Sequence, residues 1–437
     1  MLININKKSS SSFSRRDFTL GLGASSLLSC ADSRIETIYP HFKDPEYSIP
    51  GNSVYYASTC LECKAGCGIL VEVKEGRAIK IEGNPEDPNS KGGTCALGQS
   101  SVQGLYDPNR IREPLVRVET TDKLGNPVVN FQPIHINEAM SRVATAVKNS
   151  ANRFFFCSEL DTFNQEIFDD FCSLLNFKSA QYEPFNHSDL QSASKEVFGI
   201  DETPVYDLGD VNLIVSFGAE FLETWLDPVK FTKQWSALRK KKKVLHYQIE
   251  PRCSLTGSKA DKWICVNPHT EVLVALAILK HIVRLKGGTG LPSSLKERIL
   301  NIDETGFYAK SGVSKDLIIG VAGALIQSES SVVLGGGIQS RGKNKIILES
   351  VCLLINYVLG NFGKSVNFAL GVRFKSNFSN FSNLLSQLVK PEAKGAVVFI
   401  KGNFSNWIPS SFPLLDLNKL VKPGLIVYFG DILDSTS

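Results

Sequence analysis

The chain has 437 residues, of which 43% are hydrophobic and 21% are charged, and its formal net charge is +4 at pH 7. This composition suits a globular protein of about two or three domains and excludes a generally disordered chain. The first 30 residues carry a net charge of +3, so the remainder is close to neutral. A chain with so little charge gives no electrostatic reason to expect nucleic-acid binding.

Residues 1–30 have the pattern of an export signal. Ser14 to Leu20 is SRRDFTL, a twin-arginine motif, and a short apolar segment rich in Gly and Ser follows it. That segment is too short to cross a bilayer, which needs about 20 apolar residues. We therefore expect export by the twin-arginine route to the periplasm, a chance pair of arginines being the alternative.

The end of this segment predicts a lipid anchor. Leu27-Leu28-Ser29-Cys30 resembles a bacterial lipoprotein box, in which Cys30 would carry the lipid and begin the mature chain. An ordinary cleavage site beside an incidental cysteine is the alternative. Residues 31–53 contain three prolines and a glycine, and we expect them to form an extended tether to the membrane.

Four cysteines after the tether have the spacing of an iron–sulfur site. Cys60, Cys63 and Cys67 lie within eight residues, and Cys95 follows after 27 intervening residues. A [4Fe–4S] cluster is held by four Cys thiolates, one per iron, and a single short loop can supply three of them. Glycine lets the backbone approach a cluster closely. Glycines adjoin these cysteines at Gly66, Gly68, Gly92 and Gly93.

Haem, zinc and disulfides are the competing interpretations of the same four cysteines. Haem attachment requires His after the second cysteine, where this chain has Lys64. Structural zinc sites usually have two close cysteine pairs, and Cys95 has no near partner in the sequence. A [4Fe–4S] cluster is therefore the favoured prediction, while a zinc site and two disulfides stay open.

The segment between the third and fourth cysteines predicts a β-hairpin. Hydrophobic residues from Ile69 to Ile81 alternate with charged ones on either side of Glu75-Gly76. Such alternation is typical of strands with one buried face. A turn-rich loop, Gly83 to Pro88, then leads back toward Cys95, so the hairpin is expected to return the fourth thiolate to the other three.

The remaining cysteines are expected to be unpaired. Disulfides are the default expectation for an exported chain. However, Cys157 and Cys265 lie in apolar runs, and Cys172 and Cys352 lie in helix-like patterns. Free cysteine in such surroundings behaves as a small buried hydrophobic residue.

The rest of the chain predicts an α/β fold with parallel sheets. Apolar runs typical of buried parallel strands occur at Val211–Gly218, Val244–Ile249, Ser331–Gly337, Gly395–Ile400 and Leu425–Gly430. Helical spacing occurs at Glu223–Arg239 and Ile346–Val358. Ligands of open α/β sheets bind at the carboxyl ends of the strands. Glu250 stands at such an end, where it could accept hydrogen bonds from a guanine or a ribose, or simply face solvent.

The stretch from Cys60 to Arg117 resembles the cluster-binding domain of the molybdopterin oxidoreductase family, the bis-guanine-dinucleotide enzymes related to formate dehydrogenase and dimethyl sulfoxide reductase. The similar residues are CLECKAGCGILVEVKEGRAIKIEGNPEDPNSKGGTCALGQ and then LYDPNRIREPLVR. Leu213–Trp225 is most similar to the polysulfide-reductase-like branch and to the large subunit of alternative complex III. The resemblance implies a small β-rich [4Fe–4S] domain at 54–118, then two Rossmann-like α/β units at 119–290 and 291–437.

The resemblance also implies a place for molybdopterin guanine dinucleotide. Ile249–Asp261 is similar to the family's segment for one dinucleotide, and Asn267–Glu271 stands at the place of its Pro-Gly-Thr-Asp signature. Gly335-Gly336-Gly337 is weaker support for phosphate binding. The residues implied to bind the cofactor are Gly218, Glu223, Glu250, Arg252, Thr256 and Asp261.

Two departures from the family pattern argue against a complete molybdenum site. Leu97 stands where many members have a basic residue that connects the cluster to the pterin, and leucine cannot donate a hydrogen bond. His269 replaces the glycine of the later signature, and its ring would crowd a dinucleotide. No catalytic residue or molybdenum ligand is assigned, because Asn186, His187 and Ser188, near the expected region, are expected to be ordinary loop residues.

The second α/β unit is expected to be incomplete. Family members continue past the stretch similar to Asp431–Ser437 into a C-terminal β-rich domain that closes over the cofactor. A partner chain could supply that domain, and we expect little molybdenum on this polypeptide alone.

Two functions follow from these observations. The first is an exported oxidoreductase subunit that carries electrons between its [4Fe–4S] cluster and a molybdopterin site, with other iron–sulfur and membrane subunits as partners in a respiratory complex. The second is a non-catalytic electron-transfer or scaffold subunit of an assembly like alternative complex III, without molybdenum.

Overall fold

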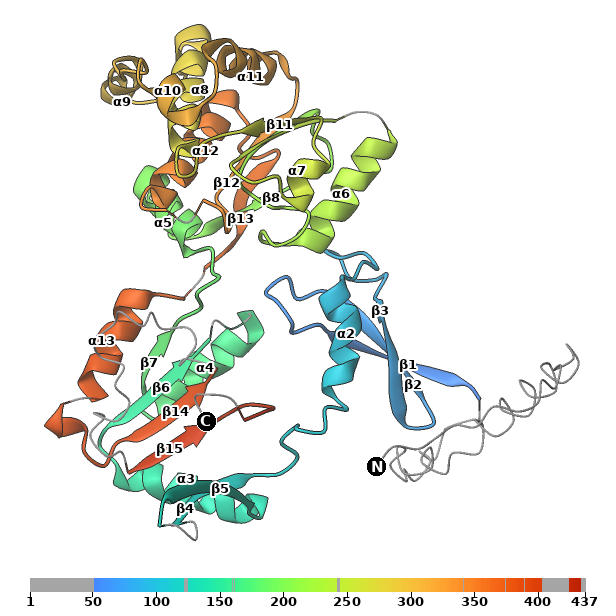
Figure 1. Cartoon of the computed structure of the whole chain (residues 1–437), viewed down its shortest axis with the longest axis vertical. Helices are drawn as coiled ribbons and strands as arrows, with labels where there is room; N and C mark the ends of the chain where they lie inside the picture. Colours follow the sequence, from blue (N-terminus) through green and yellow to red (C-terminus); the bar gives the residue numbers. More distant parts are fainter. Residues whose placement is uncertain are drawn as a thin grey trace, which may run out of the picture. The chain divides into compact units, whose positions relative to one another are not determined.

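The computed structural model describes residues 51–121, 125–158, 160, 162–241, 244–340, 342–373, 375–388, 390–402 and 424–433. In these ranges the chain has a mixed α/β fold, with a three-stranded sheet near its start and two four-stranded parallel sheets after it (Figure 1). The predicted fold class is therefore confirmed. The predicted signal, Cys30 and most of the tether lie outside the described residues.

The small sheet contains the predicted hairpin. Its order is β1-β2-β3, with β1 (Ser53–Thr59), β2 (Gly68–Lys74) and β3 (Arg77–Gly83). Glu75 and Gly76 between β2 and β3 have φ values of 51° and 76°. Two successive positive φ angles are typical of the tight hairpin turn that matches strand twist. Among the described residues, 51–55 and 72–79 belong to one compact unit, and 56–71 and those from 80 onward belong to the other.

A helix and a second hairpin follow the small sheet. They are α2 (Ala96–Gly104), β4 (Leu115–Thr121) and β5 (Pro127–Pro133), followed by α3 (Ile136–Asn149). The antiparallel pairing of β4 with β5 runs from Leu115 opposite Pro133 to Thr121 opposite Pro127. This hairpin crosses the predicted boundary at residue 118.

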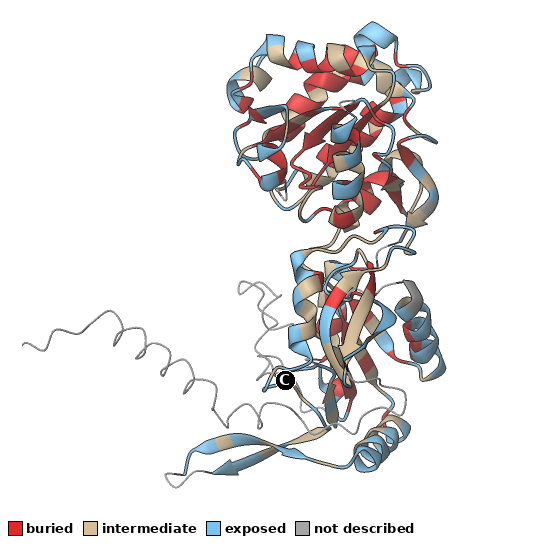
Figure 2. Ribbon diagram, turned by 90° about the vertical axis from the view of Figure 1, so that its right-hand side faces the viewer, coloured by how far each residue is buried: buried red, intermediate tan, exposed pale blue. Residues whose placement is uncertain are grey.

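The first parallel sheet, named the β9 sheet, has the order β11-β10-β9-β12. Its strands are β9 (Leu213–Phe217), β10 (Leu245–Glu250), β11 (Lys262–Cys265) and β12 (Ser331–Gly335). Its main helices are α6 (Pro228–Lys240), α8 (Glu271–Lys286), α11 (Lys315–Gln327) and α12 (Lys345–Leu359). Leu213 and Val215 pack into one hydrophobic core and Ile214 into another, so both faces of the sheet are buried (Figure 2).

The second parallel sheet, named the β6 sheet, has the order β15-β14-β6-β7. Its strands are β6 (Arg153–Cys157), β7 (Lys178–Gln181), β14 (Val397–Lys401) and β15 (Leu425–Tyr428). Helices α4 (Thr162–Leu174) and α13 (Phe378–Leu388) pack against it in two separate hydrophobic clusters. Each sheet combines strands from both sides of residue 290. The two α/β units are therefore interleaved along the chain rather than consecutive as predicted.

Shorter elements lie in the connections between and within the two sheets. They are α5 (Ser188–Phe198), α7 (Leu255–Ser258), α9 (Ser293–Leu300), α10 (Phe307–Ser311), the 3-10 turn η2 (Pro391–Ala393), and the antiparallel strands β8 (Thr203–Tyr206) and β13 (Val366–Val372). Within the described ranges, every helix is too short or too polar to cross a bilayer.

The helix predicted from Glu223 begins five residues later. Asp227 is its N-cap, with Oδ1 accepting a hydrogen bond from the Lys230 N–H at 3.1 Å, and Pro228 occupies its first turn. Pro is favoured there because its missing N–H is not needed. The Asp-Pro pair therefore overrides the helical spacing of the residues before it.

The scattered cysteines are free in the described chain, but not all are buried. Cys157, Cys172 and Cys352 are buried as predicted, and burial raises the pKa of Cys157 to about 12. Cys265 is exposed, contrary to the prediction, because it ends β11 at the outside of the β9 sheet. Cys253 is exposed as well.

Candidate functional site

Three of the four predicted cluster ligands lie on one closed loop. The Cys60 N–H donates to the Cys67 carbonyl at 2.9 Å, which joins the two ends of the loop between β1 and β2. Gly66 has a φ of 58°, which glycine adopts without strain. Cys60 and Cys67 are buried, whereas Cys63 is exposed at the turn between them.

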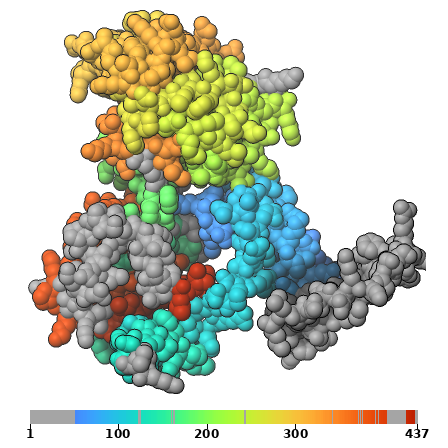
Figure 3. Space-filling view, viewed as in Figure 1, coloured from blue at the N-terminus to red at the C-terminus, as the bar shows by residue number. Residues whose placement is uncertain are grey.

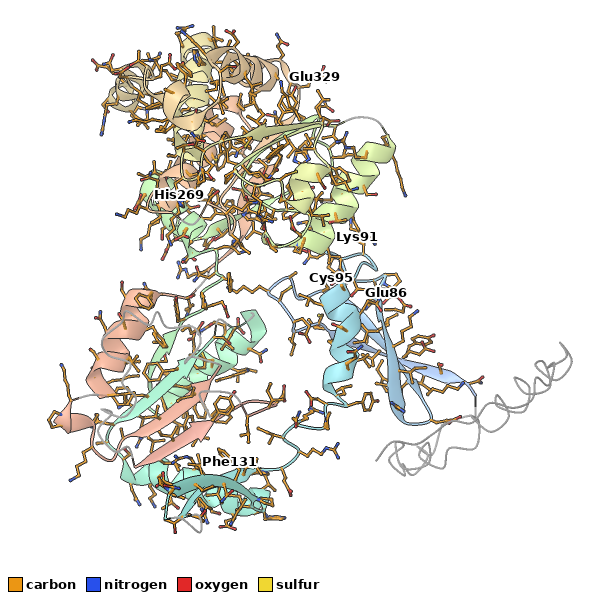
Figure 4. The ribbon with its side chains drawn as sticks, viewed as in Figure 1. Glu86, Lys91, Cys95, Phe131, His269 and Glu329 are labelled. Atoms are coloured by element: carbon orange, nitrogen blue, oxygen red, sulfur yellow. The ribbon has the colours of Figure 1, made fainter. Side chains whose placement is uncertain are left out.

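The fourth predicted ligand lies at the start of a helix. Cys95 is the N-cap of α2, and its side chain makes no capping hydrogen bond (Figure 4). A helix N-terminus carries partial positive charge and favours anionic groups such as thiolates. Gly98, one turn into α2, brings the helix against the loop, since a Cβ there would lie 3.6 Å from Cys60 Sγ.

Helix α6, which follows β9 in the chain, packs against the cysteine loop and the segment before Cys95. Val229 packs in one hydrophobic cluster with Cys60 and Cys67. A Cβ on Gly93 would lie 2.6 Å from Val229 Cγ1, so glycine is needed where the loop before Cys95 meets α6. Lys233 Nζ also donates a hydrogen bond to the Lys91 carbonyl. The cysteine loop therefore packs against α6 of the α/β body.

The four thiols influence one another electrostatically. Burial raises the pKa of Cys67 to about 12, helped next by Asp227 and then by the other three cysteines. Burial is also the main cause of the raised pKa of Cys63, to which Cys95, Cys60 and Asp227 add. A bound cation would reverse this balance, because metal ligation favours the thiolate.

The donor set fits an iron–sulfur cluster. Among the described residues, no three His, Cys, Asp or Glu side chains lie close enough together to hold one metal ion. A cubane takes one thiolate per iron, so its four ligands stand further apart than those of a single ion. The convergence of the four sulfur atoms on one cluster stays a prediction.

Glu250 lies at the carboxyl edge of the β9 sheet, as predicted, but its hydrogen bonds are internal. Its side chain has no exposed surface. Oε1 accepts from the Ser254 N–H at 2.7 Å, and Oε2 accepts from Gln248 Nε2 at 2.8 Å and from Gln339 Nε2 at 3.2 Å. Glu250 therefore holds three segments together at this edge rather than facing a ligand or solvent.

The other predicted residues of this edge contact one another. Gly218 has a φ of 71°, and a Cβ there would lie 2.3 Å from Ser340 Oγ, so only glycine fits beneath the loop after β12. Arg252 pairs with Glu220, not Glu250, with Nη2 2.5 Å from Oε1. The Thr256 N–H donates to Glu223 Oε1 at 3.3 Å.

Asp261 does not lie at this edge. It precedes β11, at the amino ends of the parallel strands, and accepts hydrogen bonds from Arg239 Nη1 at 2.8 Å and from the His246 N–H at 2.7 Å. Burial raises its pKa, but these hydrogen bonds and the charge of Arg239 outweigh burial and lower it. Asp261 is thus a brace between α6 and β10.

Buried acceptors at the carboxyl edge without a partner in the described chain include Glu271 Oε1, in the first turn of α8, and Gln339 Oε1, in the loop after β12. Burial raises the pKa of the Glu271 carboxyl group. Sequence reasoning did not select either residue, although Glu271 ends the signature-like Asn267–Glu271 stretch.

Asn186, His187 and Ser188 are occupied by local structure. Asn186 Oδ1 accepts from the Ser188 N–H at 2.9 Å, and His187 is the N-cap of α5. His187 Nε2 also accepts from the Leu226 N–H at 3.3 Å. These contacts give the three residues local structural roles at the start of α5.

Residues 54–107 match the family model described as the molybdopterin oxidoreductase Fe4S4 domain. This segment is a molybdopterin oxidoreductase Fe4S4 domain. The match includes all four cysteines of the predicted site and ends shortly after α2. It implies that the Fe4S4 domain binds a [4Fe–4S] cluster, the cofactor that the cysteine spacing predicts.

Curated relatives resemble the chain beyond the Fe4S4 domain. The thiosulfate reductase molybdopterin-containing subunit of Salmonella typhimurium is 23% identical, over 87% of this chain and 50% of its own length. The menaquinone reductase molybdopterin-binding-like subunit of Nitratidesulfovibrio vulgaris is 24% identical, over 72% of this chain and 46% of its own length. The arsenate respiratory reductase molybdopterin-containing subunit of a Shewanella species is 25% identical, over 54% of this chain and 28% of its own length. The chain thus spans half or less of these relatives.

A solved structure extends the likeness to the fold. Acetylene hydratase from Pelobacter acetylenicus aligns with a TM-score of 0.59 and 15% identity, over 71% of this chain and 44% of that one. The chain is therefore molybdopterin oxidoreductase-like in fold and carries an Fe4S4 domain.

Proposed function

We propose that this chain is a redox subunit whose Fe4S4 domain holds one [4Fe–4S] cluster on Cys60, Cys63, Cys67 and Cys95. The cluster would pass electrons to or from a molybdopterin site in a membrane-associated respiratory complex. The observation that carries the proposal is the meeting of one closed three-cysteine loop with a fourth cysteine at a helix N-terminus.

The protein's own residues would hold the cluster and tune it. A bound cluster supplies one-electron chemistry, and its potential depends on charge, hydrogen bonds and solvent exposure. Val229, Ile69 and Ile81 surround the buried cysteines with apolar groups that exclude water. The N-terminus of α2 offers positive potential at Cys95, while Asp227 acts on Cys67 with negative charge. Figure 3 shows the Fe4S4 domain, residues 54–107, in blue to cyan on the visible surface.

The carboxyl edge of the β9 sheet has features that suit the guanosine end of a pterin dinucleotide. Glu271 Oε1 and Gln339 Oε1 are buried acceptors without partners, and a guanine base carries N–H donors that could satisfy them. Arg252, more than half exposed, could contact a phosphate. The glycines at this edge let the backbone come close to a ligand.

The second candidate is a subunit without molybdenum. Leu97 is 58% exposed in the first turn of α2 and offers no donor or charge to a pterin. Among the relatives, one is named a molybdopterin-binding-like subunit. Both candidate functions therefore require the [4Fe–4S] cluster, whereas only the first also requires a bound pterin.

Metal analysis of the anaerobically purified full-length protein and of its native complex tests this proposal. We expect about four iron atoms per chain. Cys63→Ser should lose most of this iron, whereas Cys253→Ser, at another exposed cysteine, should keep it. Molybdenum or tungsten in the complex supports the first function, and iron alone supports the second. Absence of iron in the wild-type chain refutes both.

We also propose that the chain is exported by the twin-arginine signal and anchored through Cys30. Changing Arg15 and Arg16 to Lys should retain the protein in the cytoplasm, and Cys30→Ala should abolish labelling with a radioactive fatty acid. Unchanged export in the first variant would refute the twin-arginine route.

A further inference from the structure

Two loops from opposite sides of the β9 sheet meet above its carboxyl edge. In the order β11-β10-β9-β12, the strands β11 and β12 are the outer ones. The loop after β11 contains His269, and the loop after β12 contains Gly342. Because the strands are parallel, both loops leave from the same edge. A contact between these loops must therefore pass over the ends of β9 and β10.

His269, labelled in Figure 4, makes this contact. Its ring lies directly against Gly342, since a Cβ on Gly342 would be 2.6 Å from His269 Nδ1 and 3.3 Å from Cε1. Any larger residue at position 342 would displace the ring. The two positions are therefore complementary, a ring on one loop and the lack of a side chain on the other.

The loop of His269 is held in place by hydrogen bonds. The Asn267 N–H donates to the Ser311 carbonyl at 2.9 Å, and Asn267 Nδ2 donates to the Lys310 carbonyl at 2.8 Å. Thr270 Oγ1 donates to the Asn267 carbonyl at 2.6 Å. His269 thus projects from a braced loop, so its position does not depend on Gly342 alone.

The loop of Gly342 lies on the polar edge itself. Gln339 Nε2 donates to Glu220 Oε1 at 2.7 Å and to Glu250 Oε2 at 3.2 Å, at the ends of β9 and β10. The Gly342 N–H donates to the Ser340 carbonyl at 2.9 Å. Movement of this loop would uncover Glu220, Glu250 and the unpartnered Gln339 Oε1.

His269 adopts an unfavourable backbone conformation. Its φ is 63°, a value that most residues with a side chain rarely adopt. Glycine would take this conformation freely, so a histidine at this position carries a cost in strain. Strained residues of this kind cluster at ligand sites and switch regions, where neighbouring structure maintains them.

We propose that His269 is a latch that controls access to the carboxyl edge of the β9 sheet by holding the β12–α12 loop closed. The inference rests on the proposed function, in which this edge receives the guanosine end of a dinucleotide. Nucleotide binding requires the latch to open, so the apparent affinity is reduced by the fraction of molecules that are open. His269 therefore determines whether this chain accepts or excludes the cofactor.

Three variants of the full-length chain test the latch. His269→Ala removes the ring, and Gly342→Ala displaces it while leaving the histidine in place. Asn176→Gly is the control, because Asn176 also has a positive φ, 54°, but lies beside β7 in the β6 sheet. The first readout is hydrogen exchange at the amides of Gly342 and Lys345. The second is calorimetric binding of GDP, which presents the guanosine diphosphate of the dinucleotide.

We expect exchange at Gly342 and Lys345 to be at least about tenfold faster in His269→Ala and Gly342→Ala, and GDP to bind at least about tenfold more tightly. Asn176→Gly should match the wild type in both measurements. Unchanged exchange in His269→Ala overturns the latch, and so does GDP binding to the wild type as tight as to the variants. Faster exchange with no GDP binding to any variant supports the latch as a closure of the loop and refutes a nucleotide site at this edge.

Discussion

His246 should make the β9 sheet sensitive to acid. Its side chain has no exposed surface, its Nδ1 has no hydrogen-bond partner in the described chain, and its Nε2 lies 3.1 Å from Gln248 Oε1. Burial lowers the pKa of His246 from 6.5 to about 4, although the hydrogen bond with Gln248 opposes the change. The unfolded chain therefore binds more protons than the folded one between these values. Stability contributed by neutral His246 is present above pH 6.5 and is lost as the pH falls toward 4.

The size of this loss follows from the two pKa values. Their separation is about 2.5 pH units. At about 1.4 kcal/mol per unit, the loss approaches 3 kcal/mol at pH 4. His246→Gln keeps a hydrogen-bond donor for Gln248 but cannot titrate. Between pH 7 and pH 4, its free energy of unfolding should therefore fall by about 3 kcal/mol less than that of the wild type.

Urea unfolding followed by tryptophan fluorescence measures this difference. Three of the four tryptophans, Trp225, Trp235 and Trp263, lie in or beside the β9 sheet, so the signal reports on that part of the chain. If wild type and His246→Gln lose stability in parallel, the reasoning about His246 is wrong.

Three further substitutions test other parts of the fold. Burial raises the pKa of Glu349 from 4.5 to about 8, so stability falls as the pH rises between these values. Glu349→Gln should remove about 3.5 kcal/mol of the fall between pH 5 and pH 8, measured by urea unfolding, and a difference independent of pH would contradict this. Trp225→Ala should cost about 3–5 kcal/mol, because Trp225 is fully buried, whereas Leu174→Ala, at a residue 84% exposed, should cost less than about 0.5 kcal/mol. Gly83→Ala should destabilise the Fe4S4 domain and lower its iron content, since a Cβ there would lie 2.4 Å from the Gly92 carbonyl; full iron occupancy would refute the clash.

Local structure was predictable where short-range rules decide it. The hairpin turn at Glu75-Gly76, the strand that ends at Glu250 and the helix Lys345–Leu359 all follow from periodicity and turn residues. The order of strands did not follow, because it depends on pairing between residues more than 200 positions apart. Hydrophobic patterns show that a strand is buried but not which neighbour it pairs with.

The site was predictable to the same degree. Cysteine spacing predicts the ligands of a cluster because that chemistry demands four thiolates, and the residues around a parallel strand end follow from topology rules. Glu250 was expected to face a ligand, yet the structure assigns its acceptors to Gln248, Ser254 and Gln339. Gln339 lies 89 residues from Glu250, and no local pattern connects the two.

The interleaving of the two sheets sets an order of assembly on the ribosome. Strands β6 and β7 end at Gln181, while their neighbour β14 begins only at Val397. At about 5–20 residues per second, synthesis of the intervening chain takes on the order of 10–40 s. All four strands of the β9 sheet emerge within that interval and can pair first. The β6–β7 pair meanwhile has an unpaired edge on β6, whose residues Phe154 to Phe156 are apolar. Such an edge is the kind of surface that nascent-chain chaperones bind and that aggregates when left uncovered.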